Sequence, residues 1–205
     1  MLFRSGLRIS QTNYSVITDN NGSSGLGFGL GFAQPGQRKD VAFTLAVDEA
    51  QVVDCGSNPA FAVAGFFGDY FNPTGATKGQ AGDIVASISV VRYSSAGTLD
   101  VGASVSQCQD PICNGQSTLA SQDMGPVSPG STNTYSASWD QPNHQFVFRL
   151  NDGAPVTLAY TVPDSFPPGV ADRSFFVFGS VPHCTSQPRP LASTEAVFGN
   201  VYVNP

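Results

Sequence analysis

The chain has 205 residues, a formal net charge of −6 and only 12% charged residues. An acidic chain with two lysines, Lys39 and Lys78, lacks the cationic surface that nucleic acids and anionic membranes attract, so we expect neither as a partner. It has no run of about 20 apolar residues, so we expect no membrane insertion. The length suits one β-sandwich, and 15 phenylalanines can fill its core.

Strand-like segments recur along the chain with Gly-, Asn- or Pro-rich turns between them, and no helix-period window of useful length occurs. The predicted strand regions are residues 7–18, 25–32, 41–47, 61–72, 83–93, 99–105, a three-stranded meander at 134–162, 175–179 and 196–204. The Gly-rich run at 25–32 (GLGFGLGF) fits either a strand covered closely by another backbone or a low-complexity linker. The pattern predicts an all-β antiparallel β-sandwich that forms a single domain over residues 6–205.

The meander carries the clearest strand signal. Phe146 and Phe148 alternate with Val147 and Arg149 and precede an Asn-Asp-Gly turn at 151–153, which is typical of an antiparallel hairpin. We therefore expect both phenylalanines in the core and Arg149 in solvent.

The final strand changes its period within the segment AVFGNVYV. Ala196 and Phe198 share one parity, whereas Val201 and Val203 have the other. A β-bulge at Gly199-Asn200 would bring all four side chains to the core face.

Residues 1–5 (MLFRS) are set apart as a candidate non-native leader. Leu-Phe-Arg-Ser is the translation of the end of a widely used sequencing adapter, so this segment is excluded from fold reasoning. An ordinary start of the chain is the alternative.

Four cysteines indicate disulfides and an oxidising compartment, that is, an extracellular, cell-surface or periplasmic location. Cys108 and Cys113 flank a Pro-containing turn and can close locally, which leaves Cys55 with Cys184. Three connectivities are open, and free thiols or a metal site are the alternatives. A zinc site is disfavoured because only one pair is close in sequence.

Two motifs resemble the concanavalin A-like (laminin-G-like) jelly-roll superfamily. They are Trp139-Asp140 followed by a short turn, F-x-F-x-L and Asn-Asp-Gly, and the closing AVFGNVYV. This superfamily includes lectins, adhesion modules, polysaccharide hydrolases and lyases, and structural modules, so the resemblance implies extracellular glycan or protein contact as a class. Some relatives have an acidic residue near a structural calcium where this chain has Gly199, which puts calcium there in doubt.

Catalytic motifs are not recognisable. Retaining glucanases of this fold carry E-x-D-x-x-E on one strand, but this chain has only Glu49 and Glu195, outside any such motif. A lyase could use His144, Tyr160 and Arg149 as base and charge neutraliser, against the alternative of an exposed turn and a solvent-facing strand residue.

The predicted ligand site is the strand end Asp69-Tyr70-Phe71-Asn72, which groups an acceptor, aromatics and an amide. Trp139, the sole tryptophan, could stack on a sugar there. Strand termination at 69–72 and packing of Trp139 on the sandwich edge are the competing interpretations. The loop at 19–22 (DNNG) could supply oxygen ligands to calcium, although it lacks regular calcium-loop spacing, and no other cofactor is expected.

The sequence therefore predicts a non-catalytic, lectin-like extracellular or cell-surface module that binds carbohydrate and forms part of a larger secreted or surface protein. The alternative is a carbohydrate-active enzyme, a polysaccharide lyase or glycoside hydrolase. The third interpretation is a purely structural module.

Overall fold

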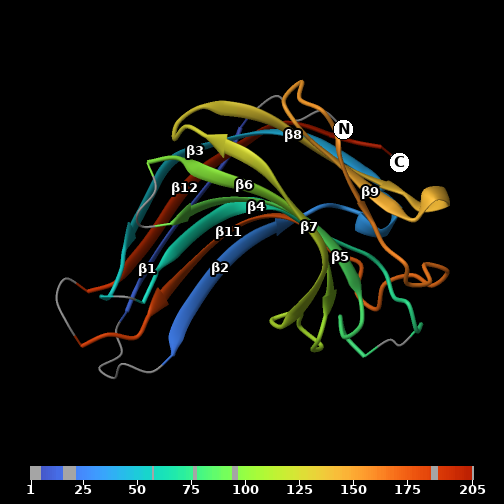
Figure 1. Cartoon of the computed structure of the whole chain (residues 1–205), viewed down its shortest axis with the longest axis horizontal. Coiled ribbons are helices and arrows are strands. Elements are labelled where there is room, and N and C mark those ends of the chain that lie inside the picture. Colours follow the sequence, from blue (N-terminus) through green and yellow to red (C-terminus); the bar gives the residue numbers. More distant parts are fainter. Residues whose placement is uncertain are drawn as a thin grey trace.

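The computed structural model describes residues 6–15, 22–56, 58–75, 78–93, 97–185 and 189–204. The candidate leader at 1–5 and residues 19–21 of the candidate calcium loop lie outside these ranges. The described residues form two six-stranded antiparallel sheets packed face to face, bent together into an arch (Figure 1). This arrangement confirms the predicted all-β, antiparallel β-sandwich.

The outer sheet of the arch is called the convex sheet. Its strands are, in spatial order, β1 (Leu7–Tyr14), β12 (Leu191–Val203), β3 (Asp40–Val53), β8 (Thr132–Asp140), β9 (Gln145–Leu150) and β10 (Val156–Ala159).

The inner sheet is called the concave sheet. Its order is β2 (Ser23–Gly31), β11 (Arg173–Pro182), β4 (Phe61–Phe71), β5 (Ile84–Tyr93), β6 (Leu99–Cys108) and β7 (Gln116–Val127). Two short 3-10 turns, η1 (Pro35–Gln37) and η2 (Gln141–Asn143), complete the described elements.

Aromatic side chains fill the space between the sheets. The Phe175 ring lies 4.8 Å from that of Phe43 and 4.6 Å from that of Phe198, so rings from β11, β3 and β12 meet in the middle of the sandwich. Such contacts add to the burial of apolar area that holds the two sheets together.

The meander has the predicted facing. Phe146 and Phe148 are fully buried, and Arg149, which follows Phe148, is exposed. His144 (φ 51°) and Asn151 (φ 51°) take left-handed conformations at the two turns. The alternation along β9 therefore predicts correctly which of its side chains lie in the core.

The closing strand contains the expected bulge. The β12–β3 register shifts between Gly199 and Tyr202, and Asn200 has a φ of 47°. Val201 and Val203 then pack against the same core cluster as Ala196 and Phe198.

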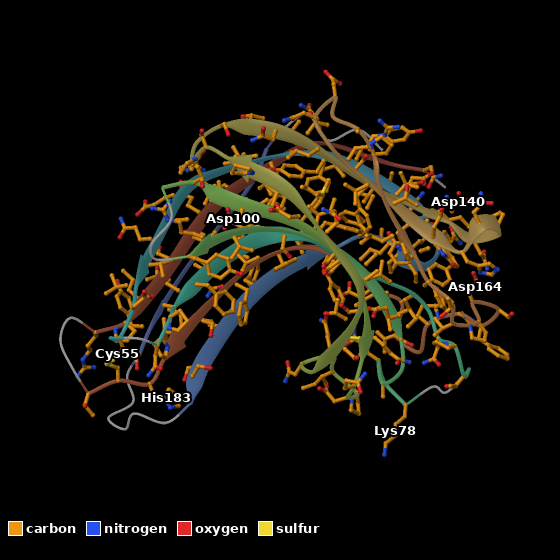
Figure 2. The ribbon with its side chains drawn as sticks, viewed as in Figure 1. Cys55, Lys78, Asp100, Asp140, Asp164 and His183 are labelled. Atoms are coloured by element: carbon orange, nitrogen blue, oxygen red, sulfur yellow. A yellow bond between two sulfur atoms is a disulfide. The ribbon has the colours of Figure 1, made fainter. Side chains whose placement is uncertain are left out.

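Both predicted disulfides are confirmed. Cys55 is bonded to Cys184 with a Cα–Cα distance of 6.1 Å, and Cys108 to Cys113 with a Cα–Cα distance of 4.7 Å. Figure 2 shows Cys55 at one foot of the arch and Lys78 at the other. These bridges fit an oxidising compartment. Within the described ranges no helix is long and apolar enough to cross a membrane.

Strand β7 was not predicted. Its sequence QSTLASQDMGPV is polar at positions of both parities, and its pairing with β6 shifts register twice, between Val101 and Gly102 and between Val105 and Ser106. A strand whose alternation is broken by bulges has no period-two signal to detect.

Candidate ligand-binding site

The predicted ligand edge at the end of β4 is buried. Asp69, Tyr70 and Asn72 are 0, 3 and 0% exposed. A register shift between Asp69 and Phe71 turns both Tyr70 and Phe71 toward the core. The expected contact between a glycan and these side chains is therefore not supported by their positions.

Tyr70 and Trp139 belong to one aromatic group at this end of the sandwich. The Tyr70 ring lies 4.8 Å from the Phe146 ring and 5.7 Å from the Trp139 ring. Trp139 is half-buried, stacks on Phe71 at 5.5 Å and donates from Nε1 to the Tyr160 hydroxyl at 2.9 Å. This environment matches the packing interpretation of Trp139.

Asp69 is an acid held away from water. Burial, together with the nearby charges of Asp83 and Asp172, raises the pKa of Asp69 to about 7, although the hydrogen bond from Gln80 Nε2 at 2.9 Å opposes the shift. Its position beneath the surface gives it a role in the pH dependence of folding rather than in ligand contact.

An accessible groove lies instead on the outer face of the concave sheet. One section, of about 330 Å³, is lined by residues of β5, β6 and β7. A second section, of about 440 Å³, is lined by residues of β4, β5, β6, β7 and β11. Ser89 and Ser104 line both sections, so the two form one continuous depression inside the arch.

Small hydroxyl-bearing side chains make the floor of this groove. They are Ser87 and Ser89 on β5, Ser104 and Ser106 on β6, Thr118 and Ser121 on β7, and Ser174 on β11. Ser87, Ser89 and Ser104 stand at alternating positions whose neighbours face the core, as the pleat of a strand requires. Ser87 Oγ and Ser104 Oγ lie 2.9 Å apart and share a hydrogen bond across the β5–β6 pair.

Gly65, on β4 between β11 and β5, has no side chain that could fill the groove. A Cβ at this position would collide with the Ile88 carbonyl oxygen. The absence of a side chain lets the neighbouring strands approach and leaves Phe176 and Ser89, its partners across the two ladders, facing the groove.

Aromatic rings stand along one side. Phe67 and Phe176 line the larger section, and Tyr93 lines the smaller one. Phe61 connects Tyr93, at 6.4 Å between ring centroids, to Phe178, at 5.9 Å. Rings from β4, β11 and the end of β5 thus border the groove, and hydroxyl-bearing side chains of β5, β6, β7 and β11 form its floor.

The charged residues that line the groove are acidic. Asp100 on β6 and Asp123 on β7 both border the smaller section, whereas Lys, Arg and His are absent from the described lining. In the β6–β7 ladder Asp123 is paired with Gly102 and Asp100 with Pro126, and a register shift lies between the two pairs. Figure 2 shows Asp100 apart from Asp140 and Asp164, which lie at the β9 end of the sandwich.

The two glutamates meet outside the groove, on the convex sheet. Glu195 of β12 is the register partner of Glu49 of β3, because a bulge at Asp48 resets the parity of β3. Arg8 of β1 bonds Glu195 and lies 3.2 Å from Asp48. This exposed cluster is an ion-paired surface and lines neither section of the groove.

The residues considered for a lyase separate into two places. His144 Nδ1 lies 3.0 Å from Asp164 Oδ2, and the Tyr160 hydroxyl donates to the same oxygen at 2.6 Å. Burial, and then the bond to Asp164, raises the pKa of Tyr160 above its usual range. Arg149 is exposed on β9 and reaches only the Gly153 carbonyl, at 3.5 Å.

Metal ligands do not gather in the described part of the chain. No group of three or more His, Cys, Asp or Glu side chains there is close enough to hold an ion. Residues 19–21 of the candidate calcium loop fall outside that part.

The serine floor could not be found from single strands. Ser87 and Ser89 in DIVASISVVRY were visible as the polar face of a strand, which every half-exposed strand has. The signal would have been a run of small polar residues on one face in consecutive strands, and it becomes informative only when the order β4-β5-β6-β7 is known.

No family model and no curated protein matches this chain. Solved structures with a similar outline include Scytalido-glutamic peptidase with a peptide-based transition-state analogue (15% identity, 89% of this chain and 75% of that chain, TM-score 0.45). A GH16 protein of Bacteroides ovatus in complex with a G4G4G3G product has 10% identity over 85% and 71%, with a TM-score of 0.43. The Emp47p carbohydrate recognition domain has 11% identity over 93% and 88%, with a TM-score of 0.39. No residue role follows from similarities of this degree.

Proposed function

We propose that this domain is a non-catalytic extracellular module that binds a neutral glycan along the groove of the concave sheet. The observation that carries the proposal is the continuous floor of serine and threonine hydroxyls on β5, β6, β7 and β11, bordered by aromatic rings. The site predicted from the sequence, at Asp69, Tyr70, Asn72 and Trp139, is replaced in this proposal by the groove.

The chemistry of the lining favours a sugar chain. Each hydroxyl is both donor and acceptor, as is each hydroxyl of a sugar, so the two can exchange hydrogen bonds in either sense. The faces of Tyr93 and Phe176 offer surfaces on which the C–H face of a pyranose can stack. Asp100 and Asp123 add fixed acceptors for sugar hydroxyls.

The charge of the lining favours a neutral ligand. Two carboxylates without a described cationic neighbour in the groove repel carboxylated or sulfated polymers. Because hydrogen bonds exchanged with water give a small net gain, we expect a dissociation constant in the micromolar to millimolar range. This range corresponds to a binding free energy of about −8 to −4 kcal/mol.

The test is a broad array of neutral and anionic glycans, with and without calcium, followed by calorimetry on any glycan bound. Ser89→Phe and Ser104→Phe should fill the shared part of the groove and abolish binding, with an unchanged thermal midpoint. Ser136→Phe is the matched control: it adds the same ring at a half-buried serine on the convex sheet. Wild-type protein that binds no glycan would leave the structural-module interpretation, and binding that survives both groove substitutions would place the site elsewhere.

A second candidate, glycoside hydrolysis, rests on Asp100 and Asp123. Both carboxylates line one section of the groove, and inverting glycosidases use a pair of carboxyl groups about 6.5–9.5 Å apart. Release of reducing ends from a bound glycan, lost in Asp100→Asn and in Asp123→Asn while binding persists, would establish it. Binding without release of reducing ends supports the non-catalytic module.

A further inference from the structure

Strand β2 ends the concave sheet with its outer edge exposed. All three of its large apolar side chains are exposed, Leu26 at 52%, Phe28 at 60% and Leu30 at 48%. The strand contains no charged residue and no proline between Ser23 and Gly31. Charged residues and prolines are devices by which natural edge strands avoid pairing with another chain, and β2 has neither.

The opposite edge of the same sheet has those devices. Strand β7 carries Asp123 and Pro126, and its ladder with β6 shifts register twice. The two edges of one sheet are therefore built differently, and β2 is the edge left open to a further strand.

The unpaired backbone groups of β2 belong to glycines. Phe32 N donates to Arg173 O at 2.7 Å, and Gly22 O accepts from His183 N at 3.0 Å, so even-numbered residues of this strand point their backbone groups at β11. By the alternation of an antiparallel ladder, the N–H and C=O groups of Gly25, Gly27, Gly29 and Gly31 point away from the sheet. A Cβ at Gly25 would lie 2.5 Å from Phe178 Cζ, so glycine here makes room for the Phe178 ring.

The sequence of the strand is palindromic. Residues 25–31 read GLGFGLG in both directions, with Phe28 at the centre. A second β2 that runs antiparallel with Phe28 opposite Phe28 sets each Leu26 against a Leu30 and each Gly27 against a Gly29. In this register the outward glycine groups form the hydrogen-bonded pairs and Phe28 forms a non-hydrogen-bonded pair, where side chains are closest.

We propose that two copies of this chain associate through β2 into a closed, two-fold symmetric dimer with one continuous sheet across both concave faces. A two-fold interface requires a surface that is complementary to itself, which a palindromic strand supplies. The strand is also uncharged in a chain of net charge −6, so two copies meet there with little repulsion. The dimer sets two grooves side by side on one face, and it stands whether or not those grooves bind a glycan.

The first test is the mass in solution. Light scattering behind a sizing column should give about twice 21.4 kDa at ~100 µM chain, with dissociation on dilution. Phe28→Lys should give a monomer with an unchanged circular dichroism spectrum. Ile112→Lys is the matched control, because Ile112 is an equally exposed apolar residue in the Cys108–Cys113 loop, and it should remain a dimer.

The second test fixes the register. Two Phe28 Cα atoms in a non-hydrogen-bonded pair lie about 4.5 Å apart, within disulfide reach, so Phe28→Cys should cross-link to itself under mild oxidation. Leu26→Cys alone should not, because its copies lie roughly 13 Å apart along the pair. A mixture of Leu26→Cys and Leu30→Cys should cross-link.

Any one of three outcomes rules out pairing through β2. They are a monomeric wild type at ~100 µM, a Phe28→Lys variant that stays dimeric, and Leu26→Cys that cross-links to itself as well as Phe28→Cys does. A wild-type mass well above that of a dimer also overturns the closed arrangement. None of these readouts uses a glycan, so they are independent of the test of the groove.

Discussion

Asn72 Nδ2 donates a hydrogen bond of 2.8 Å to Asp83 Oδ1, and both side chains are fully buried. The pair joins the residue after β4 to the residue before β5. Asp83 also accepts from the backbone N–H of Gly169 at 2.8 Å and of Val170 at 3.2 Å. One carboxylate thus ties three segments together at this end of the sandwich.

Asp83→Ala should reduce the free energy of unfolding by about 2–3 kcal/mol, because it removes one acceptor of the buried Asn72 amide and the acceptor of two part-buried backbone N–H groups, those of Gly169 and Val170. Denaturant melts measure it. Asp100→Ala, at an exposed aspartate, is the control and should change stability by less than about 0.5 kcal/mol. Equal effects at the two positions would show that the Asp83 network contributes nothing.

Phe148→Ala should destabilise the domain by about 3–5 kcal/mol, the cost of deleting a fully buried ring. Arg149→Ala at the exposed neighbouring position should cost less than about 0.5 kcal/mol. Comparable losses in urea melts would contradict the facing of β9.

Stability should fall as the pH rises from 4 to 8 through the pKa of Asp69. The folded protein holds this proton to about pH 7, whereas the unfolded chain releases it near 3.8. The contribution is complete below the unfolded pKa and is lost as the pH passes the folded one, up to about 4 kcal/mol.

Asp69→Asn isolates that contribution, because the amide oxygen can still accept from Gln80. The variant should be more stable than the wild type at pH 8, and its free energy of unfolding should no longer decline between pH 4 and 7. Urea midpoints across this range measure both effects. A wild-type slope that survives the substitution would assign the pH dependence to other groups.

The two disulfides should differ in their stabilising effect. In the loop-entropy model, the Cys55–Cys184 bridge, with a sequence separation of 129, contributes about 5 kcal/mol and the Cys108–Cys113 bridge, with a separation of 5, about 2 kcal/mol. Alanine pairs that replace each bridge in turn, compared by thermal unfolding, measure the difference. A larger loss from the short bridge would refute this account.

Local sequence determined the elements whose signal is complete within one or two strands. Phe146 and Phe148 share one parity and Arg149 has the other beside an Asn-Asp-Gly turn, and such a pattern admits one facing. The parity change after Phe198 identified the bulge at Asn200, because a buried strand must keep its apolar residues on one side. The cysteine count and the local 108–113 pair led to both bridges.

Tertiary structure decided where a ligand could reach. The register shift after Asp69 turned Tyr70 inward, and nothing in Asp-Tyr-Phe-Asn distinguishes a bulge from regular alternation. Ser87, Ser104, Thr118 and Ser174 come from four strands, and each is an ordinary outward residue on its own. Because antiparallel strand order depends on non-local pairing and on the curvature of the whole sheet, their assembly into one groove exists only in the folded chain.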